Sequence, residues 1–306
     1  MNTTIGNIDL KIPIYNAAGV HCITHNELDY LNKLDYCGAI ITKSCTLNPR
    51  TGNNHPRYWS DDNYSINSSG LPNKGYAYYS DWINKTNLNK HCFLSTAPTT
   101  YIEFNEILNS IAKSNWINYP EINLSCPNLK TNIYNIKTLE EYLRKTSEII
   151  DCNYGLKMPA LLDSCMFDKY SDIIKHHPKI SYITCINSIP NGLYIDVATN
   201  TTRILPNSGL GGIGGSPCLP VALSNVYNFK QRLPNLDIVG CGGIYSGKDV
   251  LQHILAGASA VQIGTCLYNE GPICFKKIHN ELQELMKTYN YKNIKNIIGT
   301  VKNISL

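Results

Sequence analysis

Strand-like and helix-like segments alternate along the whole chain, and this alternation limits the possible fold more than any other feature. Eight short runs rich in apolar and β-branched residues have the length of strands, at residues 12–18, 38–44, 91–96, 120–125, 154–158, 181–187, 236–243 and 258–265. Amphipathic segments of helical length lie between them, at residues 24–35, 101–114, 137–150, 219–233, 246–258 and 274–287. Thr24, Thr138 and Ser246 stand where helix N-caps are expected. Eight β-then-α units predict an α/β fold of the (β/α)₈ TIM-barrel type.

The main rival architecture is a doubly wound open sheet. Its dinucleotide-binding forms carry G-x-G-x-x-G after the first strand, and no such motif follows residues 12–18. No repeat, low-complexity tract or Pro/Gly linker divides the sequence, so we expect a single barrel domain over residues 1–306. Two long insertions, residues 46–75 and 189–216, are expected at the C-terminal face of the strands, and residues 192–205 are expected to form a β-hairpin.

Charge and cysteine content argue against several classes of protein. The net charge of +4 comes from scattered lysines and arginines without a basic block, so we expect no nucleic-acid partner. No two of the twelve cysteines have C-x-x-C spacing, which argues against zinc and iron–sulfur sites and predicts no metal. Neither a signal sequence nor an apolar run of about 18 residues is visible. We therefore expect no membrane partner and a cytoplasmic protein in a reducing compartment.

Polar and small residues gather at the carboxyl ends of the expected strands. In a barrel these ends meet at one face, which is where active sites lie. The ends carry Lys43 with Ser44, Asn123, Lys157, Asn187 with Ser188, and the stretches 241–243 and 264–265. Glycines at such ends suit either a phosphate or a tight turn, and lysines are either ligands or solvated rim residues. Their joint placement favours a binding site.

A cysteine follows the fourth expected strand in the sequence INLSCPN, residues 122–128. Pro127 ends the hydrogen-bond ladder and disfavours a helical conformation for Cys126, so the thiol lies where a loop begins. Free cysteines most often fill core space. From these residues alone, a structural cysteine and a reactive thiol both remain open.

Nine segments in order along the chain together resemble the dihydroorotate dehydrogenases. They are KSCT (43–46), PRTGNNHPRY (49–58), SINSSGLPN (65–73), NLSCPN (123–128), LKMP (156–159), CINS (185–188), GLGGIGG (209–215), GCGGIYSG (240–247) and HILAGAS (253–259). The first two are most similar to the soluble, fumarate-dependent class 1A enzymes. The resemblance implies a flavoprotein oxidoreductase that converts (S)-dihydroorotate to orotate in de novo pyrimidine biosynthesis.

The resemblance also implies FMN as cofactor and a set of binding residues. FMN would contact Ala18, Gly19, Lys43, Ser44, Asn123, Lys157, Ile186, Gly215, Cys241, Gly242, Gly243, Gly264 and Thr265. The substrate would contact Lys43, Asn67, Ser69, Gly70, Leu71, Asn123, Asn128, Asn187 and Ser188. Asparagine offers a donor and an acceptor together, which suits the imide edge of orotate. Lys157 would stabilise negative charge on the reduced flavin.

Cys126 matches the catalytic base of class 1 enzymes in this family. In the implied reaction a hydride leaves C6 for flavin N5, while Cys126 takes the C5 proton. Ser69 departs from the family, which usually has methionine beside the substrate carboxylate; its backbone N–H remains able to bind that group.

The implied electron acceptor is fumarate, reduced to succinate, and the implied oligomer is a homodimer. One alternative is a related pyrimidine reductase or a class 1B-type catalytic subunit that passes electrons to an NAD-linked partner. Others are a non-catalytic ligand-binding barrel and a flavin-free phosphate-binding isomerase. The joint presence of Lys43, Asn123, Cys126, Lys157 and Asn187 favours the enzyme.

Overall fold

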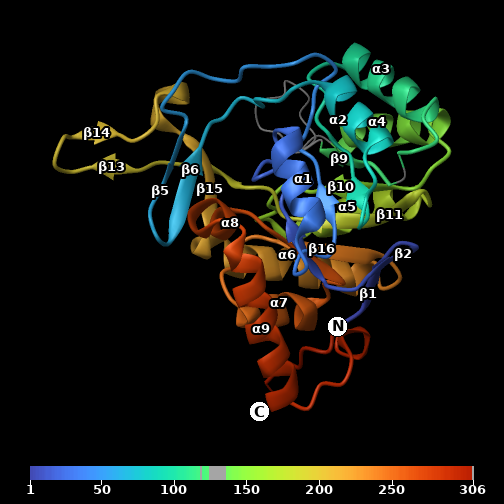
Figure 1. The fold of residues 1–306 in the computed structure, drawn as a ribbon, viewed down its shortest axis with the longest axis vertical. Helices are drawn as coiled ribbons and strands as arrows, with labels where there is room; N and C mark the ends of the chain where they lie inside the picture. The colour runs from blue at the N-terminus through green and yellow to red at the C-terminus, as the bar shows by residue number, and fades with distance from the viewer. Residues whose placement is uncertain (118, 124–135, 305–306) are drawn as a thin grey trace.

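A curled parallel sheet forms the centre of the molecule (Figure 1). The computed structural model describes residues 1–117, 119–123 and 136–304. Seven parallel strands follow one another in the order β3 (Ile14–Asn16), β17 (Ala260–Ile263), β16 (Asp237–Cys241), β11 (Ile180–Cys185), β10 (Tyr154–Lys157), β9 (Glu121–Asn123) and β8 (Ser95–Thr96). A parallel pair, β4 (Ile40–Ile41) and β7 (Cys92–Phe93), continues the sheet. Each of the eight expected strand segments contains a strand, and the third contains two pieces, β7 and β8.

Hydrogen bonds between β3 and β4 close the ring of strands. The Gly38 backbone N–H donates to the Ile14 carbonyl at 2.8 Å. Beside it, the Asn16 side chain donates to the Ile41 carbonyl at 2.8 Å and accepts from the Ile41 N–H at 3.0 Å. On the other side of β4, the Ile40 N–H donates to the His91 carbonyl at 2.9 Å. The predicted barrel is therefore confirmed.

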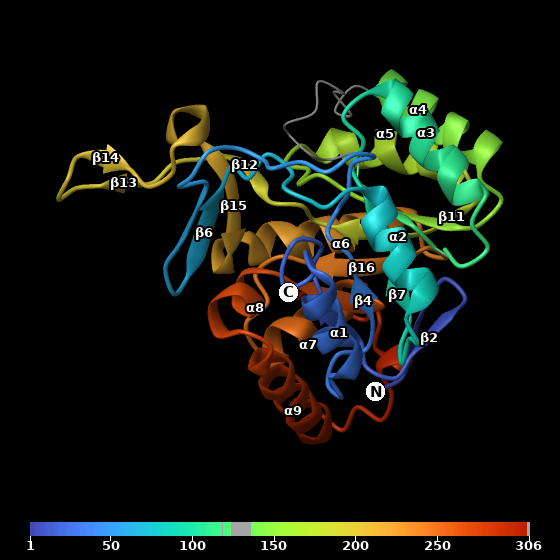
Figure 2. The same ribbon diagram turned by 45° about the horizontal axis from the view of Figure 1, so that its top comes forward.

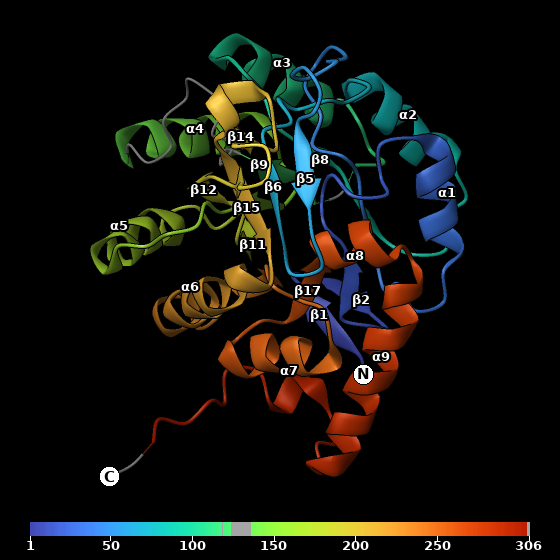
Figure 3. The same cartoon turned by 90° about the vertical axis from the view of Figure 1, so that its left-hand side faces the viewer.

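Helices surround the strands (Figure 3). They are α1 (His25–Lys33), α2 (Tyr76–Lys85), α3 (Tyr101–Ala112), α4 (Ile136–Ile149), α5 (Ser164–Lys175), α6 (Leu219–Arg232), α7 (Gly247–Ala256), α8 (Thr265–Glu270) and α9 (Ile273–Thr288), with short 3₁₀ turns at Pro206–Gly209, Ser216–Cys218 and Ile294–Asn296. Thr24 and Ser246 form capping boxes at α1 and α7. The expected cap at Thr138 is wrong, because α4 begins two residues earlier at Ile136.

The two insertions combine into a second sheet over the carboxyl ends of the barrel strands. Its order is β12 (Ile189–Gly192), β15 (Gly211–Gly215), β6 (Tyr64–Asn67) and β5 (Tyr58–Ser60), all antiparallel. The hairpin of β13 (Ile195–Asp196) and β14 (Thr201–Thr202) confirms the one predicted within 192–205. This hairpin projects from the body of the molecule (Figure 2). The pairing of the two insertions places a roof over the barrel mouth.

A hairpin of β1 (Thr3–Ile5) and β2 (Ile8–Leu10) packs at the amino ends of the strands. The Thr3 hydroxyl donates to the Ser259 carbonyl at 2.6 Å, and the Gly6 N–H donates to Asp237 at 2.8 Å. Within the barrel, the ring of Phe93 lies 5.7 Å from that of Tyr15 and 5.5 Å from that of Tyr182. The amino end is thereby filled, and the open end faces the second sheet. None of the described helices has the length and apolar character needed to cross a membrane.

Candidate active site

A cavity of about 680 Å³ lies between the carboxyl ends of the barrel strands and the second sheet. This volume is within the range of small-molecule and cofactor sites. All the predicted binding residues that the structure describes line it: Ala18, Gly19, Lys43, Ser44, Asn67, Ser69, Gly70, Leu71, Asn123, Lys157, Ile186, Asn187, Ser188, Gly215, Cys241, Gly242, Gly243, Gly264 and Thr265. Cys126 and Asn128 lie outside the described residues. The barrel thus brings together residues that are up to 247 positions apart, since Ala18 and Thr265 line the same space.

The lining of the cavity is basic. Among its described residues are the cations Lys43, Arg57 and Lys157, and none of the described lining residues is Asp or Glu. Low-dielectric walls strengthen the field of such charges. The cavity therefore suits anionic ligands.

Glycines form one end of the cavity. At Gly243, φ is +76°, and an added Cβ would lie 2.4 Å from the Cβ of Leu219. At Gly215, φ is +90°, and an added Cβ would lie 2.5 Å from the Asn63 carbonyl oxygen. Side chains are therefore excluded at both positions, so backbone lines this end of the cavity. Such a surface binds phosphate well.

A buried histidine at the start of the segment 253–259, to which the sequence assigned no role, supports this end. The Nε2 of His253, on α7, lies 3.1 Å from the Gly242 carbonyl, so Nε2 carries the proton and donates. Burial lowers the pKa of His253 to about 4. The imidazole is therefore neutral near pH 7 and holds the Gly242 turn as a hydrogen-bond donor.

The floor of the cavity contains a polar chain that leads into the barrel. Lys157 Nζ donates to Gln262 Oε1 at 3.0 Å, and Gln262 Nε2 donates to Glu121 Oε2 at 3.2 Å. The Thr184 hydroxyl also donates to Glu121 Oε2, at 2.6 Å. Burial raises the pKa of Glu121, while Lys157 and the hydrogen bonds from Thr184 and Gln262 oppose that rise. Glu121 and Gln262 were also missed from the sequence, although a charged residue within a barrel strand was a visible signal.

A second group of polar residues lies at the ends of β3, β4 and β9. An added Cβ on Gly19 would lie 3.1 Å from Lys43 Nζ, so the ammonium packs against this glycine. Asn123 Nδ2 donates to the Ser44 hydroxyl at 3.3 Å, and that hydroxyl lies 2.9 Å from the Ser95 hydroxyl. These contacts fix Asn123 and Ser44 against each other in the wall.

The second sheet and its loop supply the opposite wall. Asn67 Nδ2 donates to the Gly212 carbonyl at 3.3 Å, and the Ser188 N–H donates to Asn187 Oδ1 at 2.8 Å. Gly70 and Leu71 both have left-handed backbones, with φ of +71° and +56°. The turn at these residues brings Ser69, Gly70 and Leu71 to the cavity. Its neighbour Asn53 donates from its backbone N–H to the Ser69 carbonyl at 2.9 Å.

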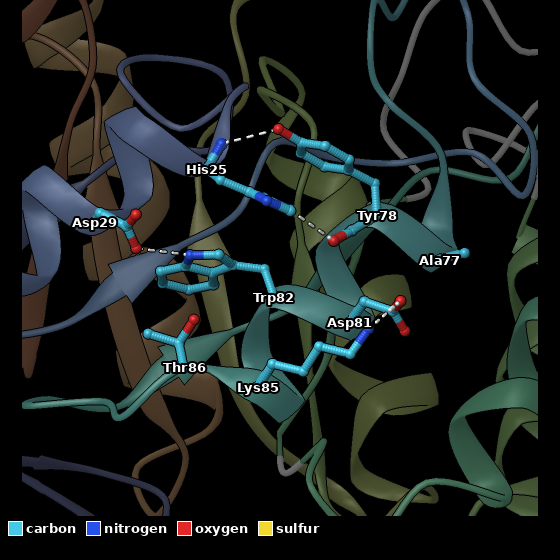
Figure 4. A pocket seen from close by; sticks show the side chains of 8 residues that line it. All are labelled: His25, Asp29, Ala77, Tyr78, Asp81, Trp82, Lys85 and Thr86. Atoms are coloured by element: carbon cyan, nitrogen blue, oxygen red, sulfur yellow. Dashed lines mark hydrogen bonds and ion pairs between the residues drawn. The ribbon is translucent and has the colours of Figure 1, made fainter.

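A shallower hollow of about 560 Å³ lies between α1 and α2 (Figure 4). Its side chains bind one another: the rings of His25 and Tyr78 stack at 3.7 Å, and Trp82 Nε1 donates to Asp29 at 2.9 Å. The described residues contain no cluster of metal-ligating side chains here or elsewhere. We therefore place the functional site in the cavity at the barrel mouth.

Comparison with known proteins gives one family. The family model described as dihydroorotate dehydrogenase matches residues 1–286. The chain is 43% identical to the dihydroorotate dehydrogenase (fumarate) of Trypanosoma brucei brucei, over 95% of each chain. It is 39% identical to dihydroorotate dehydrogenase A (fumarate) of Lactococcus lactis subsp. lactis, over 99% of this chain and 100% of the relative.

The fold has a close structural match. A crystal structure of the dihydroorotate dehydrogenase of Eimeria tenella in complex with ferulenol superimposes with a TM-score of 0.80. The match covers 98% of this chain and 88% of the other, at 19% sequence identity. At that identity it supports the barrel architecture.

Proposed function

The chain belongs to the dihydroorotate dehydrogenase family, and on this basis we propose that it oxidises (S)-dihydroorotate to orotate and passes the electrons to fumarate. This is an oxidation step of de novo pyrimidine biosynthesis. The observation that carries the proposal is the basic cavity at the barrel mouth, where Lys43, Lys157, Asn67, Asn123 and Asn187 meet. Relatives named as fumarate-dependent cover nearly the full chain, which supports fumarate as the acceptor.

The flavin required by this family is, we propose, FMN. The glycine end of the cavity suits its phosphate, because at Gly215 and Gly243 a side chain would collide with the neighbouring backbone or side chain. When bound, the flavin supplies the hydride acceptor. Lys157 lies in the floor as a cation that favours negative charge on a reduced ring.

Orotate and fumarate share features that this cavity can bind. Both carry carboxylates, which suit Lys43 and the backbone turn at Ser69–Leu71. The side chains of Asn67, Asn123 and Asn187 offer donors and acceptors to the imide edge of orotate. Ser69 is smaller than methionine, so packing beside the carboxylate is looser and substrate affinity should be affected more than turnover.

Cys126 is proposed as the base that takes the C5 proton, and Asn128 as a substrate ligand. Both follow β9, whose last residue, Asn123, lines the cavity. In the sequence only two residues separate Asn123 from Cys126, which supports the proposal. A thiolate is competent as a general base.

A homodimer is the proposed assembly, with the β13–β14 arm as its contact. The arm exposes apolar side chains that project into solvent: Leu193, Ile195, Val197 and Leu205. A second copy of the chain that covers them would remove an unusual apolar patch from water. The cytoplasm is the proposed location, since the described cysteines are free thiols, the usual state in a reducing compartment.

The test is anaerobic mixing of purified protein with dihydroorotate, followed by stopped-flow mixing with fumarate. We expect the flavin absorbance band to bleach and then return, with orotate competing against fumarate for the same cavity. Return of the band with NAD but not with fumarate would instead favour a class 1B-type subunit. No bleaching by dihydroorotate would refute the proposed reaction.

A further inference from the structure

A buried carboxylate lies one layer below the floor of the cavity. Glu121 is on β9 two residues before Asn123, so both side chains point to the same side of the strand. In the register of β9 with β10, Asn123 is opposite Lys157 and Glu121 is opposite Gly155. Glu121 is fully buried, whereas Asn123 and Lys157 line the cavity.

Stability of the fold alone does not explain why an acidic residue, Glu121, is buried here. Its Oε2 accepts from Thr184 and Gln262, but Oε1 has no hydrogen-bond partner among the residues that the structure describes. An unsatisfied buried polar atom destabilises the folded state, and more so when it is charged. An apolar residue of similar size would fill the same space without this cost.

Gln262 connects Glu121 to the cavity. Its Oε1 accepts from Lys157 Nζ at 3.0 Å, while its Nε2 donates to Glu121 Oε2 at 3.2 Å and to the Tyr15 hydroxyl at 3.4 Å. The ammonium and the carboxylate thus bind opposite ends of one amide. Hydrogen bonds in such a chain polarise one another, and their electrostatic effect is large in the low dielectric of a barrel interior.

We propose that Glu121 is a positioning residue that acts on the flavin site through Gln262 and Lys157, as the buried counter-charge that partly offsets the lysine cation. This inference rests on the proposed flavin site. Lys157 and the hydrogen bonds from Thr184 and Gln262 favour the ionised carboxylate of Glu121 against the effect of burial. A negative charge at this depth opposes negative charge on the reduced ring, so Glu121 lowers the reduction potential that Lys157 raises. The balance between the two keeps the reduced cofactor able to give its electrons to fumarate.

The test is a spectroscopic redox titration of the holoenzyme against a reference dye, a measurement that needs bound flavin but no turnover. Glu121→Gln removes the charge and keeps an oxygen for Thr184 and Gln262. We expect its reduction equilibrium to shift at least tenfold toward the reduced form, which is about 30 mV for a two-electron couple. Tyr182→Phe is the matched control, because it removes a buried hydroxyl beside Glu121 that has no described hydrogen-bond partner. Its potential should stay at the wild-type value.

A second variant guards against poor folding of the first. Gln262→Glu in the Glu121→Gln background keeps one carboxylate but moves it directly onto Lys157, and it should shift the equilibrium about tenfold toward the oxidised form relative to wild type. A wild-type potential in the folded Glu121→Gln protein, or an upward shift of the potential in the double variant, would overturn the inference. The proposed reaction fails separately: wild-type flavin that dihydroorotate does not bleach refutes the substrate, whatever the titrations give. A chain that binds no flavin refutes both.

Discussion

The imidazole of His253 lies beneath the turn at Gly242, where its Nε2 donates to the carbonyl and its Nδ1 has no partner among the described residues. Gly240 leaves the space that the ring occupies, since an added Cβ there would lie 2.4 Å from Nδ1. Because the residue is fully buried, protonation would place an uncompensated charge in the core. The histidine is therefore a neutral support for the glycine end of the cavity.

The lowered pKa of His253 predicts a pH dependence of stability. The folded pKa is about 4 and the unfolded value about 6.5, so between these values the unfolded chain binds a proton that the folded protein does not. The free energy of unfolding is therefore unaffected by this group above pH 6.5. As the pH falls from 6.5 to 4 it decreases, by about 3 kcal/mol in all. Denaturant unfolding of wild type and of His253→Gln at several pH values measures it. Identical slopes against pH in the two proteins would contradict the assignment.

Replacement of the proposed base should separate chemistry from cofactor binding. Cys126→Ala is expected to retain FMN but to slow flavin reduction by dihydroorotate by roughly 10²–10⁴-fold, the usual contribution of a general base. Cys126→Ser is the conservative control and should be partly active with a higher optimal pH. Stopped-flow reduction measures both, and near-normal reduction in the alanine variant would show that another group takes the proton.

At single positions, sequence motifs located the cavity lining well, from Ala18 to Thr265, but missed His253 and Glu121. Both are polar residues inside elements whose apolar pattern decides the fold. Their partners, Gly242 and Gln262, lie in other parts of the chain, so the hydrogen bonds depend on strand register and helix packing. Neither can be deduced from local spacing.

At the level of elements, the contact between strand β16 and helix α7 is set by a glycine. Gly240 in β16 faces His253 in α7, and the ring approaches the strand more closely than a side chain on β16 would allow. Sequence periodicity located both elements correctly. The close packing between them could not be predicted from the sequence, because a glycine such as Gly240 can equally be required by backbone conformation.

Gly240→Ala should therefore destabilise the protein by about 1–3 kcal/mol through overpacking. The double variant Gly240→Ala with His253→Ala tests the cause, since the smaller residue makes room for the added methyl group. We expect the two effects to be non-additive, with the double variant more stable than the sum of the single changes allows. If chemical denaturation shows that the losses in unfolding free energy are additive, the strain does not come from the contact between Gly240 and His253.

The second sheet was the element that sequence reasoning could not assemble. The two insertions were expected near the barrel mouth, and the hairpin within 192–205 was expected, but nothing in either segment indicated that β6 pairs with β15. That pairing joins Asn67 to Gly212 across 145 residues. Long-range strand pairing depends on tertiary packing more than on local pattern.

For the whole molecule, the projecting β13–β14 arm is the feature on which the proposed dimer rests. Val197 is 92% exposed at this arm and Ile195 is 53% exposed. Because these side chains are exposed, their substitution should have little effect on the stability of the monomer. They are therefore good positions at which to test the proposed dimer without disturbing the barrel.

Val197→Asp should weaken the proposed dimer at least tenfold while leaving flavin binding unchanged. A charge on an apolar contact is expensive to bury. Ile102→Asp on α3 is the matched control, since Ile102 is 72% exposed but lies away from the arm. Light scattering over a range of protein concentrations measures the mass. A monomeric wild-type protein, or a dimer unaffected by Val197→Asp, would remove the arm from the interface.

The closure of the barrel at β3 and β4 has a kinetic consequence. Both hydrogen bonds between Asn16 and Ile41 come from one side chain, and rotation of that side chain would release both together. Amide deuterium exchange at Ile41 should therefore be faster than at Ile183 in β11, which is paired with strands on both sides. Asn16→Leu should accelerate exchange at Ile41 and leave Ile183 protected. Faster exchange at Ile41 would mark the contact between β3 and β4, beside Lys43, as the line along which the barrel opens first.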